Sequence, residues 1–320
     1  MNSITKNYLD KETIKKLVKH NFRENSIVNY EKVEGGFCNA VYRIRLKDEK
    51  DVILKVAPDV NIQLMSCEKS MMQTEAEAMS LAQNYGIPGV PNVYAYDDSK
   101  RLCSSAYIFM ENKYGNSLAD EKELMSGEKR KQTEFEIGRI LKRINTIKGE
   151  KFGHFCVKEL QYDNWFEAFY HMFSGVISDG INAKIEIGVS YKDILDKLLD
   201  DKKYFAEVTQ PRLIHFDSWD GNFLMKNEKI TGIIDWERAM WAEGLMEDKF
   251  RFHSVSQDFL QGYGMETFTV SQKIRSYWYD IYLYLIMMFE VTYRQYETNE
   301  QYDWVHGLFI QVWDSLLKIR

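Results

Sequence analysis

The order of apolar and polar positions divides the 320-residue chain into a strand-rich first third and a helix-rich remainder. In the first third, alternating apolar and polar residues and a short charged turn are typical of neighbouring antiparallel strands. A helix is expected to run from Ser66, as its N-cap, to about Tyr85, and to end at Gly86. Strands are expected over four segments: 41–47, 51–57, 93–96 and 106–110.

Residues 111–117 are polar and contain a glycine, so this segment is the best candidate for a linker. After it the pattern becomes helical, interrupted by two short strands near residues 213–215 and 230–235. Helices are expected over six ranges: 128–146, 162–176, 191–206, 246–262, 271–296 and 300–318. The chain is therefore predicted to be an α+β protein, with an antiparallel-sheet lobe that carries one main helix (residues 1–111) and a larger, mainly helical lobe (residues 112–320).

Composition restricts the classes of partner. The chain has 42 Lys plus Arg against 48 Asp plus Glu, a net charge of −6, and lacks a long basic run, which argues against nucleic acid and slightly favours a cationic small molecule. The apolar segment 281–289 is too short to cross a bilayer and is expected to be a buried core helix. The first 20 residues lack a signal-peptide pattern, and the four well-separated cysteines suit reduced thiols, so a cytoplasmic protein without a membrane partner is expected.

The strongest chemical signal lies in residues 213–224, followed within a dozen residues by residues 233–237. Phosphoryl transfer requires a carboxylate that orients an acceptor hydroxyl and oxygen ligands for Mg²⁺ on the phosphates. Asp217, Asn222 and Asp235 can supply these three groups. The alternative is a β-hairpin in which these Asp and Asn residues only form turns.

At these residues the sequence resembles the aminoglycoside phosphotransferase family and its choline-kinase-like relatives, which share the protein-kinase fold. The family pattern His-x-Asp-x-x-x-x-Asn is present here as His215, Asp217 and Asn222, and the later Ile-Asp-Trp includes Asp235 and Trp236. The resemblance implies that Asp217 is the catalytic base, that Asn222 and Asp235 bind magnesium, and that His215 braces the catalytic loop. A histidine between two apolar residues is also commonly a hydrogen-bonded structural residue.

Upstream residues fit a nucleotide site. Gly35 and Gly36 resemble the family's nucleotide loop, although a Gly-Gly pair between strands can also be a simple hairpin turn. Lys55 lies on an apolar strand and needs an anionic partner. Glu75 is the expected partner because it interrupts an apolar helix face, whereas Glu77 has polar neighbours. The alternative is an exposed Lys55 and a Glu75 at the edge of the apolar stripe.

The resemblance also implies that the adenine edge meets the backbone around Met110 and Asn112, at the end of the interlobe strand. Family members often carry His-Pro between the base and the Gly-Asn, where this chain has Trp219 and Asp220. Asp220 is expected either to contact a cationic acceptor or to cap the loop. Glu243 and Glu247 are further candidates for contact with the acceptor: the first stands where the family often has Gly-Asp-Pro, and the second follows it closely.

Taken together, the sequence predicts an ATP-dependent kinase that phosphorylates a hydroxyl of a small molecule, with Mg²⁺ as cofactor and GTP as an alternative donor. The acceptor is expected to be an aminoglycoside or another amine-bearing alcohol. The protein is expected to be a monomer or a homodimer. The competing interpretation is a non-catalytic, spore-coat-like protein of the same fold, which a missing base or metal ligand would favour.

Overall fold

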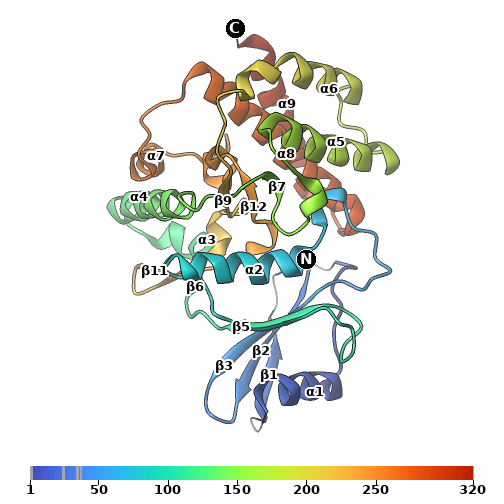
Figure 1. Ribbon diagram of the computed structural model, residues 1–320. Coiled ribbons are helices and arrows are strands. Elements are labelled where there is room, and N and C mark those ends of the chain that lie inside the picture. The colour runs from blue at the N-terminus through green and yellow to red at the C-terminus, as the bar shows by residue number, and fades with distance from the viewer. Residues whose placement is uncertain (1–2, 24–25, 34–35, 37, 320) are drawn as a thin grey trace.

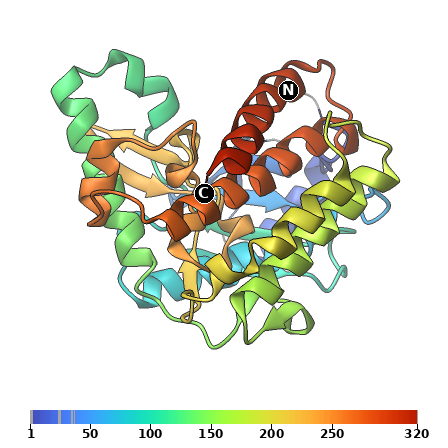
Figure 2. The same ribbon diagram turned by 90° about the horizontal axis from the view of Figure 1, so that it is seen from above.

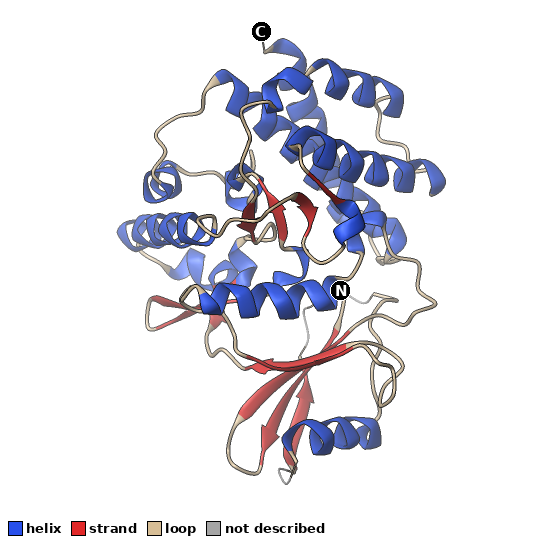
Figure 3. Ribbon diagram, in the orientation of Figure 1, coloured by secondary structure: helices blue, strands red, loops and turns tan. Residues whose placement is uncertain are grey.

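The computed structural model describes residues 3–23, 26–33, 36 and 38–319. Strands gather in one lobe and helices dominate the other (Figures 1 and 3). The small lobe holds a five-stranded antiparallel sheet of order β1-β2-β3-β5-β4. Its strands are β1 (Ile27–Lys32), β2 (Ala40–Leu46), β3 (Asp51–Val56), β4 (Val93–Asp97) and β5 (Tyr107–Glu111). The predicted α+β architecture with an antiparallel N-terminal sheet is confirmed.

Helix α1 (Lys11–Phe22) covers part of this sheet and was not predicted from the sequence. It buries only Ile14, Leu17 and Val18, a short stripe at spacings of three and four residues within a charged segment. These three side chains join the apolar side chains of β2, β3 and β5 in one hydrophobic cluster. A second, larger hydrophobic cluster fills the helical lobe. The larger cluster also takes in α2 and two residues of β5, Ile108 and Met110, so it extends across the junction between the lobes.

Helix α2 (Met71–Asn84) lies between the sheet and the helical lobe (Figure 1). The predicted helix was too long, because residues 66–68 form a separate 3₁₀ turn and the N-cap is Ser70 rather than Ser66. Ser70 has φ +54°, in the left-handed region, which interrupts the helical path before Met71.

The large lobe contains helices α3 (Leu118–Glu121), α4 (Gly127–Ile144), α5 (Trp165–Asn182), α6 (Tyr191–Asp200), α7 (Gln257–Tyr263), α8 (Val270–Tyr293) and α9 (Glu300–Lys318). Helices α8 and α9 lie side by side (Figure 2). Helix α8 is buried from Trp278 to Ile286, which confirms the predicted core helix. None of the helices in the described part of the chain is both long and apolar enough to cross a membrane.

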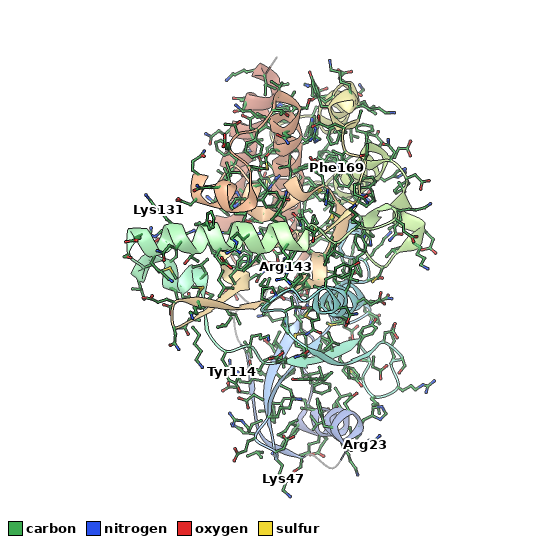
Figure 4. The ribbon with its side chains drawn as sticks, turned by 60° about the vertical axis from the view of Figure 1, so that its left-hand side comes forward. Arg23, Lys47, Tyr114, Lys131, Arg143 and Phe169 are labelled. Atoms are coloured by element: carbon green, nitrogen blue, oxygen red, sulfur yellow. The ribbon has the colours of Figure 1, made fainter. Side chains whose placement is uncertain are left out.

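Two small sheets complete the large lobe, with strand orders β11-β10-β6 and β8-β7-β12-β9. Their strands are β6 (Asn116–Ser117), β7 (Phe152–His154), β8 (Gln161–Tyr162), β9 (Arg212–Ile214), β10 (Phe223–Lys226), β11 (Lys229–Ile233) and β12 (Met240–Ala242). Only β9 and β11 were anticipated from the sequence. Figure 4 shows Tyr114, in the connection between the lobes, lying between Lys47 of the small lobe and Phe169 of the large lobe.

The helix predicted over 246–262 is wrong for most of its length. The chain instead forms 3₁₀ turns at 244–246 and 248–250, and α7 begins only after the N-cap Ser256. Between the two turns, Glu247 has extended backbone angles, φ −58° and ψ 141°. A continuous helix would be incompatible with the contacts that Glu247 makes, which are described below.

Candidate active site

The catalytic loop connects β9 to β10 and carries Asp217. Phe216, just before Asp217, has φ +68°, an unfavourable conformation for a side chain of this size. The amide of Asn222 donates to the main-chain oxygen of Asp217 over 2.8 Å, which ties the two ends of the loop together. Burial raises the pKa of Asp217 to about 7, with Arg238 opposing the shift. This carboxyl group is therefore able to gain and lose a proton near neutral pH.

The buried side chain of Glu247 accepts hydrogen bonds from several residues of this loop. Its carboxylate accepts hydrogen bonds from the main-chain N–H groups of His215 (3.0 Å) and Phe216 (2.9 Å). It also accepts from the hydroxyl of Ser218 (3.1 Å) and the amide of Asn145 (3.0 Å). The residue is 0% exposed. Glu247 is thus an internal acceptor that fixes the strained entry to the catalytic loop.

His215 lies against the second half of the site, as expected for a bracing residue. Its Nε2 is 2.9 Å from the main-chain oxygen of Ile234, and its ring packs edge-on against Trp236. Burial lowers the pKa of His215 to about 4, so the ring is neutral and Nε2 can donate. This hydrogen bond joins the catalytic loop to the segment that carries Asp235.

Asp235 follows β11 and has φ +65° and ψ +56°, a left-handed conformation. The N–H of its neighbour Ile234 donates to the main-chain oxygen of Asn222 over 3.0 Å. This bond places Asp235 and Asn222, predicted as a ligand pair, near each other at the ends of the paired strands β11 and β10. A backbone held in a sparsely populated conformation is common at functional sites, where the surrounding contacts enforce it.

The side chain of Lys55, on β3 of the small lobe, reaches Asp235. Its ammonium lies 2.8 Å from a carboxylate oxygen of Glu75 and 3.2 Å from one of Glu237, and it also pairs with Asp235. Burial would lower the pKa of Lys55, but these carboxylates raise it well above its usual value. The same ammonium outweighs burial at Asp235 and holds the pKa of that carboxyl below its usual range. The predicted Lys55–Glu75 pair is therefore present in the structure.

A cavity of about 310 Å³ connects these groups. Lys55, Asp217 and Asp235 line it, together with residues from α8, the start of α9 and the segment before α7. The cavity is large enough for a small molecule beside a reacting phosphate.

Comparison with known proteins agrees with this geometry. The profile of the family described as "Phosphotransferase enzyme family" (APH) matches residues 29–246, which is more than half of the chain. The chain belongs to this phosphotransferase family. No match is found among curated proteins.

Solved structures resemble this phosphotransferase over nearly its whole length. A thermostable mutant of aminoglycoside phosphotransferase APH(4)-Ia, in ternary complex with ADP and hygromycin B, superposes with a TM-score of 0.67 at 15% identity, covering 95% of this chain and 98% of that chain. The gentamicin complex of APH(2″)-IIa gives a TM-score of 0.63 at 14% identity, with 98% of both chains covered. The streptomycin–ATP complex of APH(2″)-IIa gives 0.61 at 14%, with 95% and 97% covered. At these identities the similarity establishes the fold alone.

The predicted nucleotide residues of the phosphotransferase occupy the junction of the lobes to different extents. Gly36 lines the cavity, whereas Gly35 lies outside the described residues. Met110 and Asn112 are buried at and just beyond the end of β5, the strand that pairs with β3 next to Lys55. Neither of them is among the residues that line the cavity.

The three residues predicted to contact the acceptor are engaged elsewhere. Asp220 pairs with Lys122 and Lys249, Glu243 pairs with Arg275 over 2.7 Å and accepts from Tyr279, and Glu247 is buried under the catalytic loop. None of them is among the residues that line the cavity. The structure thus departs from the sequence interpretation, because internal cations and N–H groups satisfy these carboxylates.

Sequence reasoning missed several residues that do line the cavity. Glu237 approaches Lys55 and also accepts a hydrogen bond from the amide of Asn39. Its position two residues after Asp235 was a signal that could have identified it. Asp248 also lines the cavity, and its position next to Glu247 was a signal, whereas the positions of His253 and Trp304 gave no comparable one.

The oxygen donors of the site suit a hard divalent cation. Glu75, Asp235 and Glu237 each offer an oxygen within 4.8 Å of the others, but the Lys55 ammonium pairs with all three and already bridges them. Asn222 uses its amide N–H to bind the loop, which leaves its carbonyl oxygen as a ligand atom. Asn222 and Asp235 therefore form the better candidate pair of Mg²⁺ ligands, because Lys55 engages only one of the two.

Proposed function

We propose that this phosphotransferase transfers the γ-phosphate of ATP to a hydroxyl group of an amine-bearing small molecule. The supporting observation is the convergence of Lys55, Asp217 and Asp235 on one cavity. The resemblance of the fold to structures described as complexes with ADP or ATP and an aminoglycoside favours the same chemistry. GTP is the alternative donor.

Each residue then has a distinct part in the reaction. Asp217 orients the acceptor hydroxyl and receives its proton as the oxygen attacks the γ-phosphorus, while the bond from phosphorus to the β,γ-bridging oxygen breaks. Lys55, fixed by Glu75, neutralises phosphate charge, and Gly36 lets the backbone approach the phosphates. Met110 and Asn112 are proposed to lie at the adenine edge. When bound, Mg²⁺ would neutralise charge on the β- and γ-phosphates, with Asn222 and Asp235 as its ligands.

Other residues that line the cavity support an amine on the acceptor. One carboxylate oxygen of Asp248 is buried without a hydrogen-bond partner, and the pKa of this group is raised by burial only to about 6, so it is ionised at pH 7. The indole rings of Trp219 and Trp304, 40% and 52% exposed, border the same cavity. A carboxylate oxygen without a hydrogen-bond partner, in a cavity that indole rings also line, favours a protonated amine over a neutral or anionic group.

ADP release from Mg-ATP should be measured over a panel of aminoglycosides, choline, ethanolamine, homoserine and sugars, with Asp217→Ala as the paired control. Turnover that requires an amine-bearing acceptor and disappears in the variant would support the proposal. Turnover with neutral or anionic alcohols alone would contradict the acceptor class. Failure of the protein to bind ATP would favour the non-catalytic alternative.

Three further features belong to this proposal. The boundary between a nucleotide-binding lobe (1–111) and a catalytic, acceptor-binding lobe (112–320) follows the end of β5 at Glu111. A cytoplasmic location suits the supply of ATP. A monomer or a homodimer is expected, and sedimentation velocity would distinguish them.

A further inference from the structure

Four charged side chains from four separate segments meet beside the catalytic loop. Lys122 comes from the turn after α3, Glu134 from α4, Asp220 from the catalytic loop and Lys249 from the 3₁₀ turn at 248–250. Lys122 lies 2.6 Å from Asp220 and 2.8 Å from Glu134. Lys249 lies 3.1 Å from Glu134 and pairs with the other oxygen of Asp220. Each cation thus contacts both carboxylates, and these four residues are called the charge cluster below.

The charge cluster is neutral and largely shielded from water. The side chain of Lys249 is 1% exposed and that of Glu134 is 7% exposed, so neither charge would be stable here without its partners. Both carboxylate oxygens of Asp220 are already paired, one with Lys122 and the other with Lys249.

Asp220 links the charge cluster to the catalytic loop, because it lies between Asp217 and Asn222. Asp220 is three residues after Asp217 and two before Asn222, and it is the first residue of the 3₁₀ turn that ends at Asn222. A proline at this position would fix the backbone at the start of the turn. Trp219 has φ −77° and ψ 167°, the extended conformation that a following proline requires. The residue before Asp220 thus has a conformation that admits a proline, although this chain has none here.

We propose that Asp220 is a positioning residue, and that the charge cluster fixes the catalytic loop in place of a proline. By tying the start of the turn to α4 and to the 248–250 segment, the cluster maintains the spacing between the base Asp217 and the metal ligand Asn222. This inference rests on the proposed kinase function for its catalytic consequence. The inference takes the place of the predicted contact between Asp220 and a cationic acceptor. Such an acceptor would have to displace two ammonium groups that Glu134 also holds.

Two substitutions of Asp220 distinguish a role in positioning the loop from a role of its negative charge alone. Asp220→Asn removes the negative charge and keeps the shape, so the loop should loosen. kcat should fall about 10- to 100-fold, since misplacement by about 1 Å can cost that much. The Mg²⁺ concentration for half-maximal activity should rise about tenfold, as for loss of a group that orients a ligand. The KM for the acceptor should change less than twofold.

Asp220→Pro removes the same charge but fixes the backbone, so it should recover most of the lost kcat and Mg²⁺ response. Hydrogen exchange of peptides covering residues 215–224 should be faster in Asp220→Asn and close to wild type in Asp220→Pro. The matched control is Asp201→Asn, which breaks a buried pair with Lys197 outside the cavity lining. It should lower stability without changing the Mg²⁺ response.

The inference is overturned if Asp220→Asn raises only the KM for cationic acceptors, since Asp220 would then be an acceptor contact. It is also overturned if exchange in residues 215–224 stays at the wild-type rate, or if Asp220→Pro is no better than Asp220→Asn in kcat and exchange. Failure of the wild-type protein to phosphorylate any acceptor would contradict the proposed function instead. The exchange comparison would still decide whether the charge cluster fixes the loop.

Discussion

Replacing Glu247 with alanine tests whether this residue supports the catalytic loop or contacts the acceptor. The substitution removes the acceptor for two main-chain N–H groups, one hydroxyl and one amide. A buried polar group left without a partner costs about 1–3 kcal/mol. Water that enters the vacated space can satisfy some of the four donors, so we expect a total loss of about 3–5 kcal/mol in the free energy of unfolding.

For a chain of 320 residues this loss corresponds to a decrease of about 4–8 °C in Tm, because the entropy of unfolding scales with chain length. Calorimetry would give the change in Tm, and urea titration the change in free energy. kcat should fall as well, at a temperature where the variant is fully folded, since Phe216 would lose the N–H contact that holds its left-handed conformation.

Glu243→Ala provides the matched control. Glu243 is also held by internal partners, Arg275 and Tyr279, but the structure gives it no contact with the catalytic loop. This variant should lose stability and keep its kcat. If Glu247→Ala instead kept both its Tm and its kcat and raised only the KM for the acceptor, the structural role would be refuted and the contact predicted from the sequence would be correct.

Three further predictions concern the cavity itself. Lys55→Met should lower kcat/KM for ATP about 10²- to 10³-fold, because it removes the one ammonium that pairs with the three carboxylates and is proposed to bind the phosphates. Unchanged steady-state kinetics would contradict this. Burial raises the pKa of Asp217 to about 7, so the base is protonated and inactive below that pH. A plot of the logarithm of kcat/KM for the acceptor against pH should therefore rise with a slope of about one up to about pH 7 and then level off. A flat profile from pH 5.5 to 8.5 would exclude Asp217 as the titrating base. Asp248→Asn should raise the KM for amine-bearing acceptors about tenfold, as expected for loss of one charged hydrogen bond, and leave the KM for neutral acceptors unchanged. Competition between paired substrates would measure this, and equal effects on both classes of acceptor would count against an amine contact.

The sequence alone determined the parts of the site that lie in short, ordered motifs. Asp217 and Asn222 share one loop, and Asp235 follows the next strand pair, so local geometry was enough to predict that they meet. Lys55 and Glu75 were also predictable, because each breaks an apolar pattern and a buried charge requires a partner. The strand alternation and the long apolar helix predicted the α+β architecture for the same reason: local periodicity reports which face is buried.

The tertiary structure decided everything that depends on which distant groups meet. Helix α1 was missed because its apolar stripe is only three residues long and gains its meaning from the sheet beneath it. Glu247 interrupts the predicted helix because its carboxylate is required by N–H groups some 30 residues earlier in the chain. Asp220 could not be distinguished from an acceptor contact until Lys122 and Lys249 were placed beside it. A carboxylate has the same pattern in the sequence whether it faces a substrate or an internal cation, and only packing supplies the partner.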